Sequence, residues 1–182
     1  PNKSRFEIND PAERSVRVFD GFRGWKMRPG QDGIPKVQPF TPMEIRYAKE
    51  APGLDGPLID SRIKGRTVEL DGSEAVEGRP CYRLVVRLAS GERQTVWVDA
   101  QTFLEVRYDR TAYGDNGSRG TVSVFFRDYK VVEGMAVPSV IEIGRVPGHR
   151  PDRMVIDKIA LNPGIADLEF GRPGPPPRRT EV

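Results

Sequence analysis

Few residues of this chain have the types and spacing that chemistry requires. The only histidine, His149, stands in a predicted turn with no serine, cysteine or acid at a recognisable spacing, whereas a general base needs a partner within hydrogen-bond reach. The only cysteine, Cys81, alternates with Arg83 and Arg87 in a predicted strand. Nearby cations activate a thiol, but we interpret Cys81 as a small residue on the solvated side of that strand. We expect no catalytic residue and predict that the chain is not an enzyme.

Metal, cofactor and phosphate sites are not expected either. One cysteine and one histidine exclude a structural zinc site. Asp109, Asp115 and Asn116 lack the regular oxygen spacing and the terminal glutamate of a calcium-binding loop. The paired glycines near Gly21 and in segment 114–120 do not lead from a strand into a helix, as phosphate-binding loops do. We interpret Asp109, Asp115, Asn116 and these glycines as turn residues.

Aromatic residues interleaved with arginines are the remaining candidate for chemistry, because they could stack on nucleic-acid bases. They are Trp25, Trp97, Phe103, Phe125 and Tyr129. The net charge is only +3, with 29 basic against 26 acidic residues, so the electrostatic field is weaker than that of a typical nucleic-acid-binding protein. We therefore interpret these aromatics as packing between strands and expect no nucleic-acid partner.

Composition bounds the elements that could position a site. The 182 residues suffice for one domain with a core, and 37% are hydrophobic. With 19 glycines and 17 prolines, the chain favours many short elements joined by tight turns. No apolar run is long enough to span a membrane. Because the chain opens at Pro1 and a strand begins at once, we expect the N-terminal part of the domain to be absent. We expect residues 174–182 to be a solvated tail.

Strand patterns dominate the chain. Residues 3–8 alternate in the manner of a strand, and residues 15–19 and 22–27 flank an Asp20-Gly21 turn typical of a hairpin. Residues 29–39 are predicted as loop, and Thr41-Pro42-Met43-Glu44 predicts a helix that runs to about Glu50. Glycine turns then separate further expected strands near residues 66–76, 80–89, 93–99, 103–113, 120–132, 136–145 and 153–162.

These strands have one apolar side and one side that carries arginines. Tyr82, Leu84 and Val86 alternate with Arg83 and Arg87, which is typical of an antiparallel sheet with one solvated face. A sheet of about nine strands curls as its twist accumulates, and the predicted helix is too short to cover its apolar side. We therefore expect a half-open barrel whose concave apolar face is filled by a missing helix or by a ligand.

The order of several motifs resembles that of LolA-like outer-membrane lipoprotein-sorting proteins. Segments 78–84 (GRPCYRL) and 98–104 (VDAQTFL) resemble the family pattern "G-x-x-x-Y-x-L … hydrophobic-D-x-x-T-x-L". Segment 129–138 (YKVVEGMAVP) resembles "Y-x-x-V-x-G-hydrophobic-x-x-P", and segment 19–25 (FDGFRGW) resembles "YDGxxxW". The resemblance extends over about residues 3–173.

This resemblance implies a mostly β fold with a small helical component: a curved antiparallel meander that forms an open half-barrel with helices in its mouth. It implies a single domain over residues 1–173 that lacks its N-terminal helix and first strands. The family's cavity holds lipid or the acyl chains of a lipoprotein, and relatives act in the periplasm, either soluble or anchored to a membrane through an N-terminal segment that follows a signal peptide.

The functional hypothesis is a periplasmic carrier in outer-membrane lipoprotein sorting that holds acyl chains by apolar burial. The alternative is an envelope-stress or signalling module on the same fold that binds a protein partner, which could be membrane-associated, through a sheet edge or the concave face. The residues expected to face lipid are Tyr82, Leu84, Val86, Val96, Val98, Leu104, Val106, Val122, Val124, Phe126, Ile141 and Ile143.

Overall fold

The computed structural model describes residues 3–9, 14–30, 34–50, 56–113, 119–144 and 151–174. The chain forms two compact units: a first unit of Pro1–Gly53 with Pro163–Val182, and a second unit of Leu54–Asn162. Within the described ranges, no helix combines the length and the apolar character needed to cross a membrane. The assignment of residues 1–173 to one domain, followed by a tail, stays a prediction.

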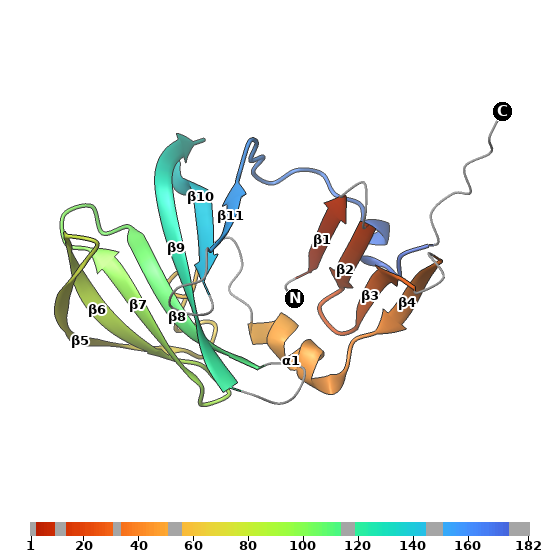
Figure 1. Cartoon of the computed structure of the whole chain (residues 1–182), viewed down its shortest axis with the longest axis horizontal. Helices are drawn as coiled ribbons and strands as arrows, with labels where there is room; N and C mark the ends of the chain where they lie inside the picture. The colour runs from red at the N-terminus through yellow and green to blue at the C-terminus, as the bar shows by residue number, and fades with distance from the viewer. Residues whose placement is uncertain are drawn as a thin grey trace. The chain divides into compact units, whose positions relative to one another are not determined.

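The first unit contains a four-stranded antiparallel sheet with strands in chain order (Figure 1). The strands are β1 (Ser4–Asn9), β2 (Arg14–Phe19), β3 (Gly24–Pro29) and β4 (Pro35–Pro39). The β2–β3 turn forms as predicted, because the Asp20 carboxylate accepts hydrogen bonds from the backbone N–H groups of Phe22 and Arg23 at 2.7 and 2.6 Å. The loop predicted over residues 29–39 is wrong for β4, which pairs with β3 and buries part of Val37 against Val16.

A helix, α1 (Pro42–Glu50), follows β4 and begins where the sequence predicts. The backbone N–H of Glu44 donates to the Thr41 hydroxyl at 3.2 Å, and the Glu44 carboxylate accepts from the backbone N–H of Thr41 at 2.8 Å. This reciprocal pair is a capping box. Lys26 of β3 also donates to Glu44, at 2.9 Å, so the same carboxylate joins the helix start to the sheet.

The second unit is a seven-stranded antiparallel meander in which each strand pairs with its neighbours in the chain (Figure 1). Its strands are β5 (Thr67–Val76), β6 (Arg79–Arg87), β7 (Arg93–Asp99), β8 (Glu105–Tyr113), β9 (Arg119–Val132), β10 (Met135–Gly144) and β11 (Asp152–Val155). The predicted strands are confirmed, although β11 ends at Val155 rather than near residue 162. The predicted turns at residues 115–117 and 147–148 lie outside the described residues.

The fold class is mostly β, with one short α-helix and open antiparallel sheets in the described part of the chain, as predicted. A second short helical element, η1 (Asp167–Phe170), belongs to the first unit, where Lys3 contacts Asp167 at 2.6 Å. The expectation of about nine strands in one sheet is wrong, because β1–β4 pair only with one another and leave seven strands in the larger sheet. The packing of helices in the mouth of the half-barrel stays a prediction.

Both sides of the seven-stranded sheet carry a buried cluster. One contains Val86, Val96 and Val124, and the other contains Cys81 and Trp97. The expectation of one solvated face is therefore wrong near Cys81, which is 1% exposed. We call the first side the inner face and the second the outer face.

Gly24 of β3 is a position where close packing leaves no room for a side chain. A Cβ atom there would lie 2.0 Å from Cδ2 of Phe40, whose ring is buried. We expect Gly24→Ala to lower the free energy of unfolding by about 2 kcal/mol, because overpacking forces the ring to move. Urea denaturation followed by circular dichroism measures this change.

Gly164→Ala is the matched control in the same unit, since a Cβ atom at Gly164 meets nothing within 4 Å. Equal urea midpoints for the two variants would contradict the close contact between Gly24 and Phe40.

Candidate functional site

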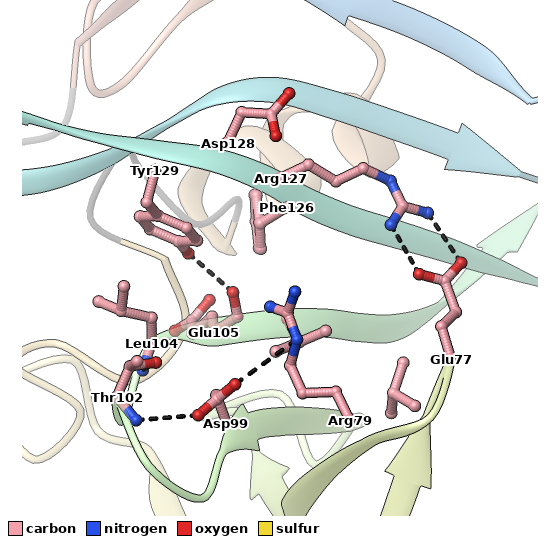
Figure 2. Close-up of a pocket in the computed structure, with 12 residues that line it drawn as sticks. Glu77, Arg79, Asp99, Thr102, Leu104, Glu105, Phe126, Arg127, Asp128 and Tyr129 are labelled. Atoms are coloured by element: carbon pink, nitrogen blue, oxygen red, sulfur yellow. Dashed lines mark hydrogen bonds and ion pairs between the residues drawn. The ribbon is translucent and has the colours of Figure 1, made fainter.

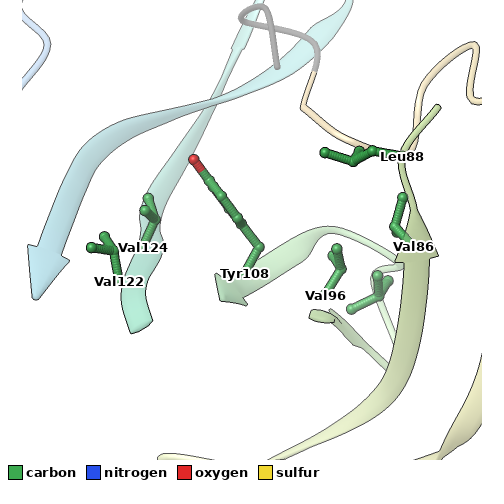
Figure 3. Close-up of a cluster of buried hydrophobic side chains, with 7 residues drawn as sticks. Val86, Leu88, Val96, Tyr108, Val122 and Val124 are labelled. Atoms are coloured by element: carbon green, nitrogen blue, oxygen red, sulfur yellow. The ribbon is translucent and has the colours of Figure 1, made fainter. Parts of the chain in front are cut away.

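The inner face is organised in rows, because directly paired residues of neighbouring strands point to the same side of a sheet. The central row is wholly apolar and consists of Leu70, Leu84, Val96, Tyr108, Val124 and Ile143. Figure 3 shows Val86, Val124 and Tyr108 pointing from three different strands into the space within the curve of the sheet. The curve therefore brings apolar side chains from distant strands together.

Most of the predicted lipid-facing residues lie on this inner face. Val86, Val96, Val98, Val122 and Val124 are buried there in one cluster. Half-buried neighbours pack against the same cluster, namely Leu84, Phe126, Ile141 and Ile143. The structure therefore brings together nine of the predicted residues as one continuous apolar surface.

Val106 does not lie with them. A register shift between Trp97 and Val98 interrupts the pairing of β7 with β8. Such a bulge places an extra residue on one strand and shifts the alternation of its side chains. Val106 consequently joins the outer-face cluster with Val76, Cys81 and Trp97, and the regular alternation of Leu104, Val106 and Tyr108 is wrong.

The inner face also has an exposed apolar part. Tyr82, which pairs with Val98, is 39% exposed and stacks on Phe103 with ring centroids 6.4 Å apart. Phe103 and Leu70 are 69% and 67% exposed. Side chains of this kind gain free energy when an apolar ligand removes them from water. The apolar surface thus extends from a closed core to residues that remain accessible.

The sequence predictions missed several members of the inner face. Val68 and Leu70 of β5 pair with Val86 and Leu84. They are two residues apart in the sequence, and this period-two spacing of apolar residues could have identified them as inner-face residues. Gln94 also belongs to this face, since it pairs with Val86 and precedes Val96 by two residues. A polar residue in an apolar row has no period-two signature of its own, which is why it was overlooked.

A pocket of about 470 Å³ opens at one end of the sheet. Pairing between β8 and β9 ends at Arg107 and Phe125, and the pocket lies beyond this point (Figure 2). Leu104, the remaining predicted residue, lines it together with Phe126, whose ring also packs against the inner-face cluster. Val76 and Val106 of the outer-face cluster also line it, so the pocket adjoins both apolar clusters.

Ion pairs and hydrogen bonds line the pocket wall, as Figure 2 shows. Arg127 donates two hydrogen bonds to the Glu77 carboxylate at 2.6 and 2.8 Å. Nε of Arg79 lies 3.6 Å from Oδ2 of Asp99. The Tyr129 hydroxyl donates to the backbone carbonyl of Glu105 at 2.8 Å. These contacts join the β5–β6 turn to β9, β6 to the end of β7, and β8 to β9.

The charges of the pocket follow from these contacts. Hydrogen bonds from Arg127 hold the pKa of Glu77 below its ordinary value. Backbone N–H groups of Thr102 and Gln101 lower the pKa of Asp99. Burial raises the pKa of the Tyr129 hydroxyl, and the nearby Glu105 charge raises it further. At neutral pH both carboxylates are ionised and the tyrosine is protonated.

The remaining candidates for chemistry are placed as follows. Cys81 is buried, its thiol donates to the Arg79 carbonyl at 3.3 Å, and burial raises the pKa of that thiol. His149 lies outside the described residues. Within the described ranges, no three His, Cys, Asp or Glu residues are grouped as a metal site would require.

Comparison with known proteins finds similarity in structure only. No family model matches the chain, and no curated protein sequence matches it. A DUF1329 family protein from Desulfovibrio piger has 20% identity and a TM-score of 0.49; the match covers 87% of this chain and 69% of that one. A protein domain named for outer-membrane lipoprotein sorting, from Vibrio parahaemolyticus, has 12% identity and a TM-score of 0.47, over 87% and 80% of the two chains.

A third solved structure, of a LolA superfamily protein from Nitrosomonas europaea, has 12% identity and a TM-score of 0.43, with coverage of 86% and 84%. The chain is thus similar in structure to proteins of the superfamily that its motifs resemble. At these identities and TM-scores, function has to be argued from the residues of the inner face and its pocket.

The ion pair between Glu77 and Arg127 leads to a prediction about pH. A carboxylate whose pKa is lower in the folded than in the unfolded chain stabilises the fold above its unfolded pKa, and this contribution is lost as the pH falls through the folded pKa. We expect the Glu77→Gln protein to lose less stability than the native chain between about pH 7 and about pH 3. Urea midpoints at the two pH values measure the loss.

Glu133→Gln, at the exposed β9–β10 turn, is the control and is expected to keep the acid sensitivity of the native chain. If Glu77→Gln behaves in the same way as this control, the ion pair makes no contribution to folding.

Proposed function

We propose that this chain is a lipid- or lipoprotein-binding carrier that holds acyl chains on the inner face of its seven-stranded sheet. One observation carries the proposal: a continuous apolar surface runs from the buried cluster around Val96 to the exposed side chains of Leu70 and Phe103. Because the sheet is curved, a ligand on this surface would contact side chains of several strands at once. A chain of methylene groups is the ligand that matches such a surface.

Physical chemistry supports this assignment. Removing apolar surface from water contributes about 25 cal/mol for each Å² buried, and it requires no directional bonds. A row of valine, leucine and aromatic side chains therefore accommodates acyl chains of different length and saturation. The adjoining pocket adds further space beside this surface.

The proposal places the protein in outer-membrane lipoprotein sorting in the periplasm, as a transport protein without enzymatic activity or cofactor. The names of two structurally similar proteins refer to the same process or superfamily. The partners proposed are acyl chains of lipid or lipoprotein and a membrane-associated protein that supplies or receives them.

A signalling module that binds a protein partner is the second candidate. The observation that favours it is strand β5, which forms an edge of the sheet and exposes nine of its ten residues. An edge strand of this length can pair with a strand of another protein. The same strand also carries three acidic residues, Glu69, Asp71 and Glu74. Charged side chains on an edge strand make pairing with another strand less favourable, which argues against this second candidate.

Tyr82→Glu tests the carrier proposal. The side chain is 39% exposed, so the change introduces charge into the apolar surface without emptying the core. We expect the dissociation constant for a fluorescent fatty acid to rise about tenfold or more, since burying one large apolar side chain contributes about 1.5–3 kcal/mol. Fluorescence titration of the purified protein measures it.

The control is Val155→Glu, which makes the same kind of change at an apolar side chain that is 57% exposed. Ile141 and Ile143 lie on the inner face, so Val140, one position before Ile141 in the same strand, points to the outer side. Val155 pairs directly with Val140 and therefore points to the outer side as well. Circular dichroism verifies that both variants fold. Native mass spectrometry of the native chain is expected to detect copurified lipid; a folded protein that carries none and takes up no fatty acid would refute the proposal.

A further inference from the structure

One row of the inner face contains two polar residues. It crosses the sheet next to the wholly apolar row and consists of Val68, Val86, Gln94, Arg110 and Val122. Gln94 pairs with Val86 on one side. Pairing of β7 with β8 ends at Thr95 and Asp109, so Gln94 and Arg110 are the next residue of each strand beyond the last pair. Two polar residues thus belong to the same end of the inner face, and the valines that pair with them, Val86 and Val122, are 0% and 2% exposed.

Gln94 is the first member of this pair. It is only 7% exposed, and its Oε1 atom has no hydrogen-bond partner among the described residues. A buried polar group without a partner costs free energy, and such groups are rare in folded proteins. A leucine would fill the same place without that cost. The Gln94 oxygen is therefore available to accept a hydrogen bond from a ligand.

Arg110 is the second member. It is half-buried, its cross-strand partner is Val122, and its charge lies near the Tyr108 hydroxyl. None of the ion pairs formed among the described residues includes Arg110. Arginines on the outer face are placed differently: Arg107, for example, pairs with Asp109 at 2.6 Å. A guanidinium that pairs with no carboxylate of the protein can donate charge-assisted hydrogen bonds to an anionic group of a ligand. Such bonds are stronger than those between neutral groups.

We propose that Arg110 and Gln94 bind the polar end of an amphipathic lipid, with Arg110 on its anionic group and Gln94 accepting a hydrogen bond from a hydroxyl. The inference rests on the proposed carrier function and adds a ligand class to it: a single anionic headgroup, carboxylate or phosphate, attached to an acyl chain. The adjacent apolar row from Leu70 to Ile143 takes the acyl chain.

Binding of four lipids with the same chain length tests whether the protein prefers an anionic headgroup. Palmitate is compared with hexadecanol, and 1-palmitoyl lysophosphatidate with 1-monopalmitoylglycerol, by displacement of a fluorescent fatty acid. We expect the native chain to bind each anionic lipid about tenfold more tightly than its neutral counterpart. The stronger of the two anionic lipids identifies a free fatty acid or a phosphate headgroup as the better ligand.

Arg110→Met is expected to abolish this preference while the neutral lipids still bind. Arg153→Met is the matched control, because Arg153 is an exposed arginine of the outer side that lies 3.5 Å from Glu142. Equal affinity of the native chain for charged and neutral lipids, or an undiminished preference in Arg110→Met, overturns the inference while the carrier function stands. If the native chain binds none of the four lipids, the carrier function itself fails.

Gln94→Leu gives a readout that does not depend on charge. In the ligand-free protein it is expected to raise the urea midpoint, because it removes the unpaired buried oxygen. It is also expected to weaken binding of the three lipids that carry a hydroxyl, namely hexadecanol and the two glycerol lipids, and to leave palmitate binding unchanged. A lowered midpoint, or equal loss of affinity for all four lipids, contradicts the role of Gln94.

Discussion

The pleat of seven consecutive antiparallel strands separates alternate side chains onto two sides of one sheet, and the second unit depends on that separation. On the inner face, pairing aligns apolar residues of six strands into a row that runs from Leu70 to Ile143. The curve of the sheet then turns these side chains toward one another. Core and candidate binding surface are therefore parts of the same face, and they differ in how far each side chain is covered.

The outer face differs from the inner face because it combines charged arginines with a buried cluster. The Arg107 guanidinium lies 4.5 Å from the Trp97 ring and 5.3 Å from the Phe125 ring, while its nitrogens pair with Asp109. Arg127 likewise lies 5.3 Å from the Phe125 ring and pairs with Glu77. An arginine stem covers an aromatic ring while its charge stays paired or hydrated. Alternating arginines therefore do not mark a fully solvated face.

Much of the fold was predictable because its signals are local. The capping box at Thr41 and Glu44, the Asp20-Gly21 turn and the period-two strands each depend on residues close together in the chain. Strand β4 was missed because a segment bounded by Pro35 and Pro39 reads as loop, and only pairing with β3 makes it a strand. Val106 was assigned to the wrong face because the bulge at Trp97 and Val98 arises from pairing between strands.

The sequence by itself determined the meander, the alternation of apolar side chains along each strand and the expectation of an apolar binding surface, since alternation and turn residues act over a few positions. Only the tertiary structure decided which side chains share a row. It placed Gln94 and Arg110 at the same end of the inner face and left the Gln94 oxygen without a hydrogen-bond partner among the described residues. It also separated Val106 from the inner face. The reason is physical: register, bulges and sheet curvature depend on contacts between residues far apart in the chain, and no local pattern encodes them.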